Sequence, residues 1–110
     1  MDPFCKITAR MQEFRTKTRY NEGKTPSWQE VFDVDVKYIG DDIVFEVWTE
    51  NIVTADEMIG QFRLKISALC VNKGVDDWWT VLYKDKDIGK LHISSNWTPD
   101  EIIEKGPVTS

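Results

Sequence analysis

The sequence is poor in the residues that cross-link a chain, bind metals or cross membranes. Its 110 residues include two cysteines, Cys5 and Cys70, and a single histidine, His92. Two cysteines cannot form the disulfide framework of a small secreted domain, and their spacing is not that of a metal site. No apolar run approaches the roughly 18 residues of a membrane-spanning helix, and the N-terminus lacks the pattern of a signal peptide. We therefore expect a reducing, cytoplasmic setting in which both thiols are small buried side chains.

Signals of catalysis and of nucleic-acid binding are missing as well. His92 has no serine or cysteine partner in a recognisable motif, and the sequence contains no Gly-rich phosphate loop and no Cys-x-x-Cys. A net charge of -5 argues against a general nucleic-acid binder. With 41% hydrophobic and 30% charged residues, the composition is typical of one folded domain. We expect a non-catalytic protein with no nucleic-acid partner.

The clearest pattern present is strict alternation of apolar and polar residues. In residues 31–36, Phe32, Val34 and Val36 alternate with Asp33 and Asp35, as in a half-buried antiparallel strand. Similar short segments recur at roughly ten-residue spacing, and no long amphipathic helix interrupts them. The pattern predicts an all-β fold, an antiparallel two-sheet β-sandwich of about seven strands, over residues 1–98, followed by a mobile tail over residues 99–110. The expected strands are residues 4–11, 13–20, 31–36, 42–48, 58–66, 78–83 and 90–97.

Basic residues are concentrated near the N-terminus. Residues 1–24 carry six basic and three acidic side chains, whereas the remainder carries eight basic and sixteen acidic ones. The alternation places Arg15, Lys17 and Arg19 on one face of one expected strand, and Lys6 and Arg10 on one face of its neighbour. Such a strip is suited to an anionic headgroup. The alternative is a solvent-facing strand whose charges provide solubility.

Several motifs, taken in order, resemble those of the C2 domain, a calcium- and lipid-binding β-sandwich. The resemblance runs from Asp2 to about Trp97. It is carried by Asp2-Pro3-Phe4-Cys5-Lys6, Pro26-Ser27-Trp28-Gln29-Glu30-Val31-Phe32, Val47-Trp48 and Asp56-Glu57-Met58-Ile59-Gly60.

The resemblance implies two candidate sites. In the family, calcium is bound by carboxylates of two loops, and the matching positions here are Asp2, Thr49, Asn51 and Glu57, with Asp56 beside them. Because two of those carboxylates are replaced, we expect calcium binding to be weak at most, and no cofactor to be required. C2 domains that bind inositol phosphates use a basic concave face, which implies a headgroup site. Its residues here are Lys6, Arg10, Arg15, Lys17 and Trp48.

The resemblance also implies an incomplete sheet. In the common C2 topology, a strand and a first calcium loop precede the Asp-Pro-Phe motif, whereas this sequence starts at Met1. Unpaired backbone groups at the neighbouring strands would recruit another chain. We therefore expect peripheral recruitment to an anionic membrane surface, largely without calcium. The alternatives are a protein-interaction module that uses an open strand edge, self-association through that edge, and weak calcium-dependent phospholipid binding.

Overall fold

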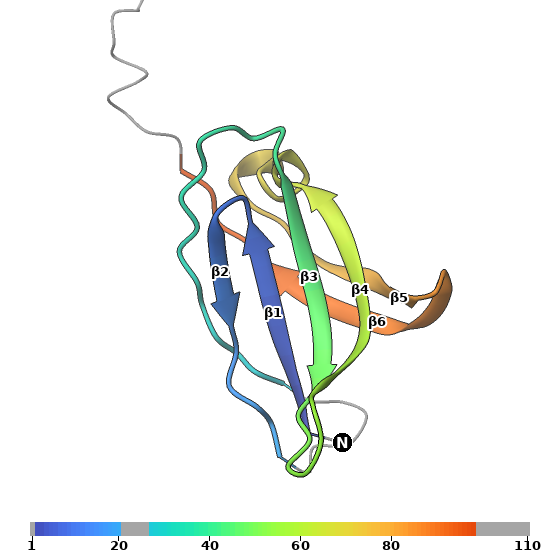
Figure 1. Ribbon diagram of the computed structural model, residues 1–110. Helices are drawn as coiled ribbons and strands as arrows, with labels where there is room; N and C mark the ends of the chain where they lie inside the picture. Colours follow the sequence, from blue (N-terminus) through green and yellow to red (C-terminus); the bar gives the residue numbers. More distant parts are fainter. Residues whose placement is uncertain (1, 21–26, 99–110) are drawn as a thin grey trace, which may run out of the picture.

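The computed structural model describes residues 2–20 and 27–98, which contain six antiparallel strands and two short 3-10 turns (Figure 1). The strands are β1 (Pro3–Ala9), β2 (Gln12–Arg15), β3 (Asp42–Thr49), β4 (Glu57–Lys65), β5 (Asp76–Tyr83) and β6 (Lys86–Ser94), and the turns are η1 (Ile66–Leu69) and η2 (Val71–Lys73). In the part of the chain that is described, no helix is long and apolar enough to cross a membrane. The mobile tail predicted for residues 99–110 lies outside the described residues.

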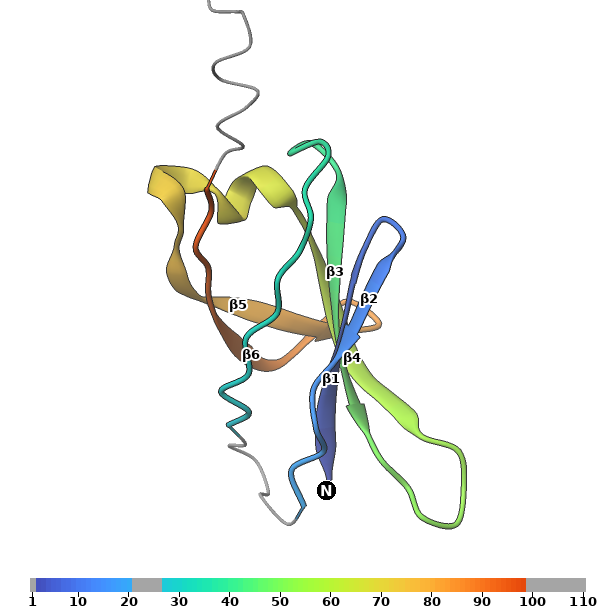
Figure 2. The ribbon, with the colours of Figure 1, turned by 90° about the vertical axis from the view of Figure 1, so that its left-hand side faces the viewer.

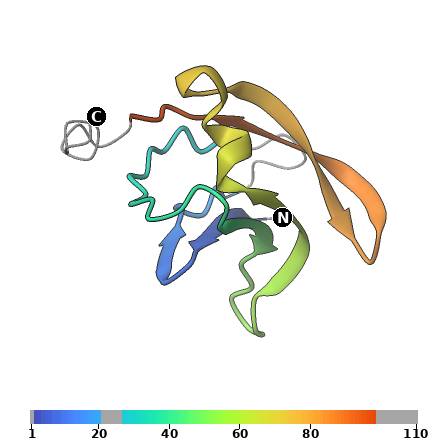
Figure 3. The same cartoon turned by 90° about the horizontal axis from the view of Figure 1, so that it is seen from above.

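The six strands form two layers. Their order in the hydrogen-bonded sheet is β2-β1-β3-β4-β5-β6. The β4–β5 ladder consists of one residue pair, Gln61 opposite Leu82, whereas the β3–β4 ladder contains eight pairs. The β5–β6 hairpin therefore turns away from β4 and lies across one face of the four-stranded layer formed by β2, β1, β3 and β4 (Figures 2 and 3). This arrangement confirms the predicted all-β, antiparallel sandwich class.

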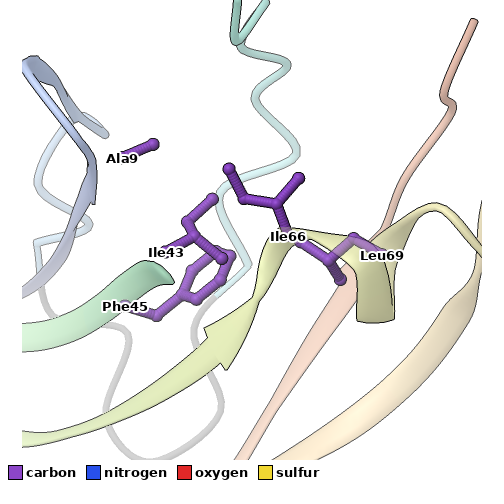
Figure 4. Packing of buried hydrophobic residues seen from close by; sticks show 5 residues of the cluster. All are labelled: Ala9, Ile43, Phe45, Ile66 and Leu69. Atoms are coloured by element: carbon purple, nitrogen blue, oxygen red, sulfur yellow. The ribbon is translucent and has the colours of Figure 1, made fainter. Parts of the chain in front are cut away.

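The core lies between these layers and is closed at one end by η1. Ala9 of β1 and Ile43 and Phe45 of β3 point inward and meet Ile66 and Leu69 of η1 (Figure 4). The Phe45 ring packs on Phe62 of β4, with centroids 5.0 Å apart. Partly buried side chains from both layers complete the core; they are Ile7, Val34, Val36, Phe62, Leu64, Cys70, Val75, Trp79, Leu91 and Ile93. Period-two alternation thus assigns one face of each strand to the core.

The prediction of a strand over residues 31–36 was wrong. The segment follows the core side of the four-stranded layer (Figure 2), but it joins no backbone ladder. Its side chains nevertheless alternate as expected, since Phe32, Val34 and Val36 are partly buried and the residues between them are exposed. Side chains fix its backbone: the Gln12 amide accepts from Asp35 N (2.9 Å) and donates to Asp35 O (2.7 Å). Alternation therefore reported the buried face correctly, but not the presence of a hydrogen-bonded neighbour.

Strand β2 is shorter than the predicted strand over residues 13–20. It ends at Arg15, and the next residue, Thr16, turns its side chain into the structure. Thr16 Oγ1 accepts a hydrogen bond from Cys5 N (2.9 Å) and donates to Lys17 O (3.0 Å). The hydroxyl therefore replaces a backbone carbonyl as the acceptor for Cys5 N, and the regular ladder ends. The chain still follows β1, because Arg19 N donates to Pro3 O (3.0 Å).

The two thiols are free in the structure. Cys5 is buried as predicted, whereas Cys70 is only half-buried. Burial raises the pKa of the Cys5 thiol to about 12, and the nearby Glu30 carboxylate acts in the same direction. Cys5 therefore stays protonated near neutral pH and behaves as a small apolar side chain.

We predict that Phe45→Ala lowers the free energy of unfolding by about 3–5 kcal/mol, because it leaves a cavity where the two layers meet. Urea denaturation followed by tryptophan fluorescence measures this loss. Val31→Ala is the matched control: Val31 is 90% exposed, so its truncation should change stability by less than about 0.5 kcal/mol. A loss below about 1 kcal/mol for Phe45→Ala would show that the core lies elsewhere.

Candidate functional site

The face of the four-stranded layer that points away from the core brings together three of the predicted site residues. Lys6 of β1 is paired in register with Arg15 of β2 on one side and with Glu46 of β3 on the other. Trp48 of β3 lies opposite Phe4 of β1 in the same ladder. Lys6, Arg15 and Trp48, which are far apart in sequence, are therefore neighbours on this surface, which we call the outward face.

Aromatic rings position both cations on the outward face. The Lys6 ammonium lies 4.4 Å from the centroid of the Trp48 ring, and the Arg15 guanidinium carbon lies 3.7 Å from the centroid of the Phe4 ring. The two rings are nearly parallel, at 14°, with centroids 6.4 Å apart. Phe4 is fully buried although it lies on the outward face. Cation–π attraction thus holds two positive charges side by side above the stacked Phe4 and Trp48 rings.

Two glutamates frame this cluster. Glu46 Oε1 accepts a hydrogen bond from Trp48 Nε1 (3.0 Å), which fixes the indole. Glu50 accepts from Arg15 Nη2 (3.3 Å), from Thr18 Oγ1 (2.6 Å) and from Tyr20 Oη (2.8 Å). Because a guanidinium carries five N–H donors, the single contact with Glu50 leaves Arg15 donors for another acceptor. Glu50 therefore orients Arg15 at the edge of the outward face.

The hydrogen bonds to Glu50 shift its ionisation and that of its neighbour. Those from Thr18 and then Tyr20, with Arg15 nearby, hold the pKa of the Glu50 carboxyl below its usual value. The same contact raises the pKa of Tyr20, since its hydroxyl donates to a carboxylate. Both shifts favour the pairing of an ionised carboxylate with a neutral phenol at neutral pH.

Arg10 and Lys17 lie outside the cluster. Arg10 is in the turn after β1, with a φ of 57°, and its guanidinium pairs with Asp41 (3.2 Å) at the opposite end of the layer from Glu50. Lys17 is exposed beyond the end of β2, on the Glu50 side. Two further cations of β4, Lys65 and then Arg63, pair with Asp42 at 2.8 and 2.9 Å and lower the pKa of that carboxyl.

The residues predicted to bind calcium lie at one end of the layer, but they do not form a set of metal ligands. Asp56 Oδ1 accepts from Asn51 N (3.0 Å), and Asn51 Nδ2 donates to Glu57 Oε1 (3.2 Å), so both carboxylates are engaged within the loop. Asp2 lies beside them, since Glu50 N donates to Asp2 O (2.9 Å). Across residues 2–20 and 27–98, no three acidic, histidine or cysteine side chains converge as a metal-binding group. The arrangement does not fit a calcium site made by this loop alone.

The loop between β3 and β4 exposes an apolar pair that sequence reasoning missed. Ile52 is 89% exposed and Val53 is 93% exposed. The loop begins at Glu50, which contacts Arg15, and it lies at the end of the four-stranded layer where β1 starts (Figure 1). An Ile-Val dipeptide flanked by polar loop residues was the available signal. Periodicity could not reveal it, because loop residues have no fixed face.

Comparison with known proteins points to one family. A profile for the C2 domain matches residues 1–82. Human extended synaptotagmin-3 is 29% identical over 97 residues, which cover 87% of this chain and 10% of that protein. A solved elicitor-responsive C2 domain protein matches with a TM-score of 0.78 and 20% identity, covering 100% of this chain and 78% of the other. The calcium-bound pair of C2 domains of extended synaptotagmin 2 matches with a TM-score of 0.73 and 24% identity, covering 87% of this chain and 35% of that one.

We predict that the Glu50 carboxyl titrates below its reference pKa of 4.5. A depressed folded-state pKa means that the Glu50 contacts contribute fully above the unfolded pKa and are lost as the pH falls through the folded value. Carbon-13 NMR of the labelled carboxyl measures the midpoint. Thr18→Val removes the largest cause of the shift and should move the midpoint upward. A midpoint at or above 4.5 in the parent chain would contradict the observed hydrogen bonds.

Proposed function

The chain belongs to the C2 domain family, and we propose that it is a non-catalytic, peripheral membrane module that binds anionic phospholipid headgroups, phosphoinositides in particular. The observation that carries this proposal is the placement of the Lys6 and Arg15 cations over the Trp48 and Phe4 rings on the outward face. A site whose charges are already positioned loses little side-chain entropy when an anion binds.

The chemistry of the cluster suits a phosphorylated headgroup. Arg15 offers a planar fork that matches two phosphate oxygens, and Lys6 offers a point charge one strand away. Lys17 adds a third cation beyond the end of β2. Each basic residue near an anionic leaflet contributes about 1 kcal/mol of attraction, so three of them give weak, reversible recruitment.

The exposed apolar pair adds a second kind of contact. Ile52 and Val53 are almost completely accessible at the tip of the loop that begins beside Arg15. Apolar side chains that enter the boundary between headgroups and acyl chains strengthen binding that charge initiates. Together, the outward face and the loop tip support an orientation in which this end of the molecule faces the bilayer.

The hydrogen bonds within the acidic loop support binding without calcium. Asp56 and Glu57 accept hydrogen bonds from Asn51. A calcium ion needs six to eight oxygens, most of them from carboxylates, whereas Asp56 and Glu57 supply four, two of which already accept hydrogen bonds. The cations of the outward face bind phosphate directly and have no need of a bridging ion.

We predict that the double variant Lys6→Gln/Lys17→Gln binds phosphatidylinositol bisphosphate vesicles about thirtyfold more weakly than the parent chain. The loss of two cations removes about 2 kcal/mol of surface attraction. Co-sedimentation with vesicles in the presence of a calcium chelator measures the affinity. The matched control is Lys84→Gln/Lys86→Gln, which removes the same charge from the exposed β5–β6 turn and should leave binding within twofold.

Three further arms separate the alternatives. Neutral phosphatidylcholine vesicles should not bind the chain. Ile52→Ser/Val53→Ser should weaken vesicle binding while leaving the melting temperature unchanged, because both side chains are exposed. Binding that occurs only when calcium is added would replace this proposal with the calcium-dependent alternative. Equal losses in both lysine double variants would mean that net charge alone, and no defined site, recruits the chain.

A further inference from the structure

The hydroxyl of Thr18 lies at the edge of the outward face, beside one of its cations. Thr18 Oγ1 donates to Glu50 Oε1 (2.6 Å), and Arg15 Nη2 donates to the same oxygen (3.3 Å). The Tyr20 hydroxyl donates to the other oxygen of the carboxylate, Oε2 (2.8 Å). Of these two hydroxyls, that of Thr18 therefore shares its acceptor atom with Arg15.

A phosphoryl group on Thr18 would present an oxygen to Arg15 in place of that acceptor. A phosphoryl oxygen stands two bonds beyond Oγ1, which is about as far from it as Glu50 Oε1 now lies (2.6 Å). The group carries about −1.5 to −2 charges near neutral pH and offers three acceptor oxygens. The planar fork of Arg15 can engage two of them, which is a stronger contact than its single bond to Glu50.

Glu50 cannot keep its position beside such a group. The hydrogen bonds from Thr18 and then Tyr20 hold the pKa of its carboxyl below the usual value, so the carboxylate is ionised and has no proton to donate. Phosphorylation of Thr18 removes the hydroxyl proton that Glu50 accepts and brings a second anion into contact. The repulsion therefore moves Glu50 away from Arg15 and leaves this cation to the phosphate.

The segment that carries Thr18 is suited to enzymatic modification. Residues 16–19 have no regular secondary structure, and the two residues that flank Thr18, Lys17 and Arg19, are exposed and basic. Arg15 adds a third basic side chain before them, and kinases select substrates partly by such charge patterns. Thr18 itself is half-buried, so modification requires a local opening of this surface segment, which costs less than opening the core of the sheet.

We propose that Thr18 is a phosphorylation site, and that its phosphate takes the place of Glu50 on Arg15 and so closes the headgroup site. A protein kinase of basic specificity would transfer the γ-phosphoryl group of a nucleoside triphosphate. The bond from Oγ1 to phosphorus forms, the bond from phosphorus to the β–γ bridging oxygen breaks, the hydroxyl proton passes to the base of the kinase, and the nucleoside diphosphate leaves. This inference rests on the proposed headgroup site and adds its regulation.

Closure acts through occupancy as well as through charge. The Thr18 phosphate belongs to the same chain as Arg15, so the guanidinium meets it at a far higher effective concentration than it meets a headgroup. The added negative charge also opposes the attraction of Lys6 and Lys17 to an anionic leaflet. Phosphorylation of Thr18 should therefore weaken membrane binding more than the same charge placed elsewhere on the molecule.

Vesicle co-sedimentation in a calcium chelator tests the switch on the full chain, with phosphothreonine encoded at position 18. Vesicles that contain phosphatidylinositol bisphosphate should bind this form at least thirtyfold more weakly than the unmodified chain. The matched control carries the phosphothreonine at position 80, because Thr80 Oγ1 also lies beside a cation, accepting from Lys90 Nζ (3.2 Å), but on the β5–β6 hairpin. The control form should bind within threefold of the unmodified chain.

Phosphorus-31 NMR tests the contact between the phosphate and Arg15 without any membrane. The second pKa of the Thr18 phosphate should be lower in the folded chain than in urea, because a nearby guanidinium favours the dianion. Arg15→Gln should remove most of this difference. If circular dichroism shows that repulsion from Glu50 unfolds the phosphorylated chain, both measurements are made with Glu50→Gln, whose amide donates to the phosphate and does not repel it.

Kinase treatment of the folded chain tests whether Thr18 can be reached. A panel of serine/threonine kinases that select basic substrates, supplied with adenosine triphosphate, should phosphorylate Thr18, and mass spectrometry locates the modification. Thr18→Val should abolish the modified peptide. Modification confined to other hydroxyls, or none at all, would overturn the assignment of the site.

The vesicle and NMR results separate this inference from the proposed function. Equal binding by the unmodified chain and the form phosphorylated at Thr18 would overturn the inference and leave the proposed function standing. Equal losses from phosphates at Thr18 and Thr80 would also overturn it, since charge alone would then explain both, as would a phosphate pKa that Arg15→Gln leaves unchanged. Absence of binding by the unmodified chain would overturn the proposed function, and this regulation with it.

Discussion

Burial of apolar side chains between two layers is the constraint on which this structure depends, because among the described residues the β4–β5 ladder joins the layers through one backbone pair, Gln61 with Leu82. Hydrogen bonding along the sheet therefore cannot align the β5–β6 hairpin with the four-stranded layer. Ile43 and Phe45 from one side, η1 from the end, and Trp79 from the hairpin provide that alignment by packing. The position of the hairpin is set by side-chain fit, which is why truncation at the centre of the core should be costly.

The same alternation that builds the core leaves the other face of β1, β2 and β3 free for chemistry. Ile7 and Ala9 point into the core, while Lys6, the residue before Ile7, points outward and lies over Trp48. Phe4 departs from a simple inside–outside division, since it is fully buried on the outward face with Arg15 above it. The stacked Phe4 and Trp48 rings lie beneath the two cations. The cations of the candidate site therefore rest on aromatic rings.

Most of the fold was predictable from the sequence because strand periodicity and turn residues are local signals. The strands predicted over residues 42–48 and 58–66 correspond to β3 and β4, with shifts at their ends. The strand predicted over residues 31–36 failed for a physical reason: periodicity reports which side chains face the core, whereas a ladder requires a neighbour that is not encoded in the segment itself. Strand β2 ended early because the Thr16 hydroxyl replaced a backbone partner.

The candidate site was predictable only in part. Lys6, Arg15 and Trp48 were identified in advance and lie together in the structure. Arg10 was predicted to lie on the same face, but it is in the turn after β1 with a positive φ, and its guanidinium pairs with Asp41. The convergence of Thr18 and Tyr20 on Glu50 joins segments about 30 residues apart, and the exposed Ile52 and Val53 belong to a loop. Local periodicity cannot predict contacts between distant segments or the conformation of loops.

The central claim is that the outward face binds phosphorylated headgroups at the ring-supported cations. Its most direct test is proton–nitrogen NMR of the nitrogen-15-labelled chain during titration with a short-chain phosphoinositide. A calcium chelator is present throughout. The five tryptophans of the sequence give five indole signals. The account predicts that the Trp48 indole and the Lys6 and Arg15 amides shift together and saturate, while the indole of Trp78, on the hairpin, stays unchanged. Saturable shifts confined to the β5–β6 hairpin, or none at all, would contradict it.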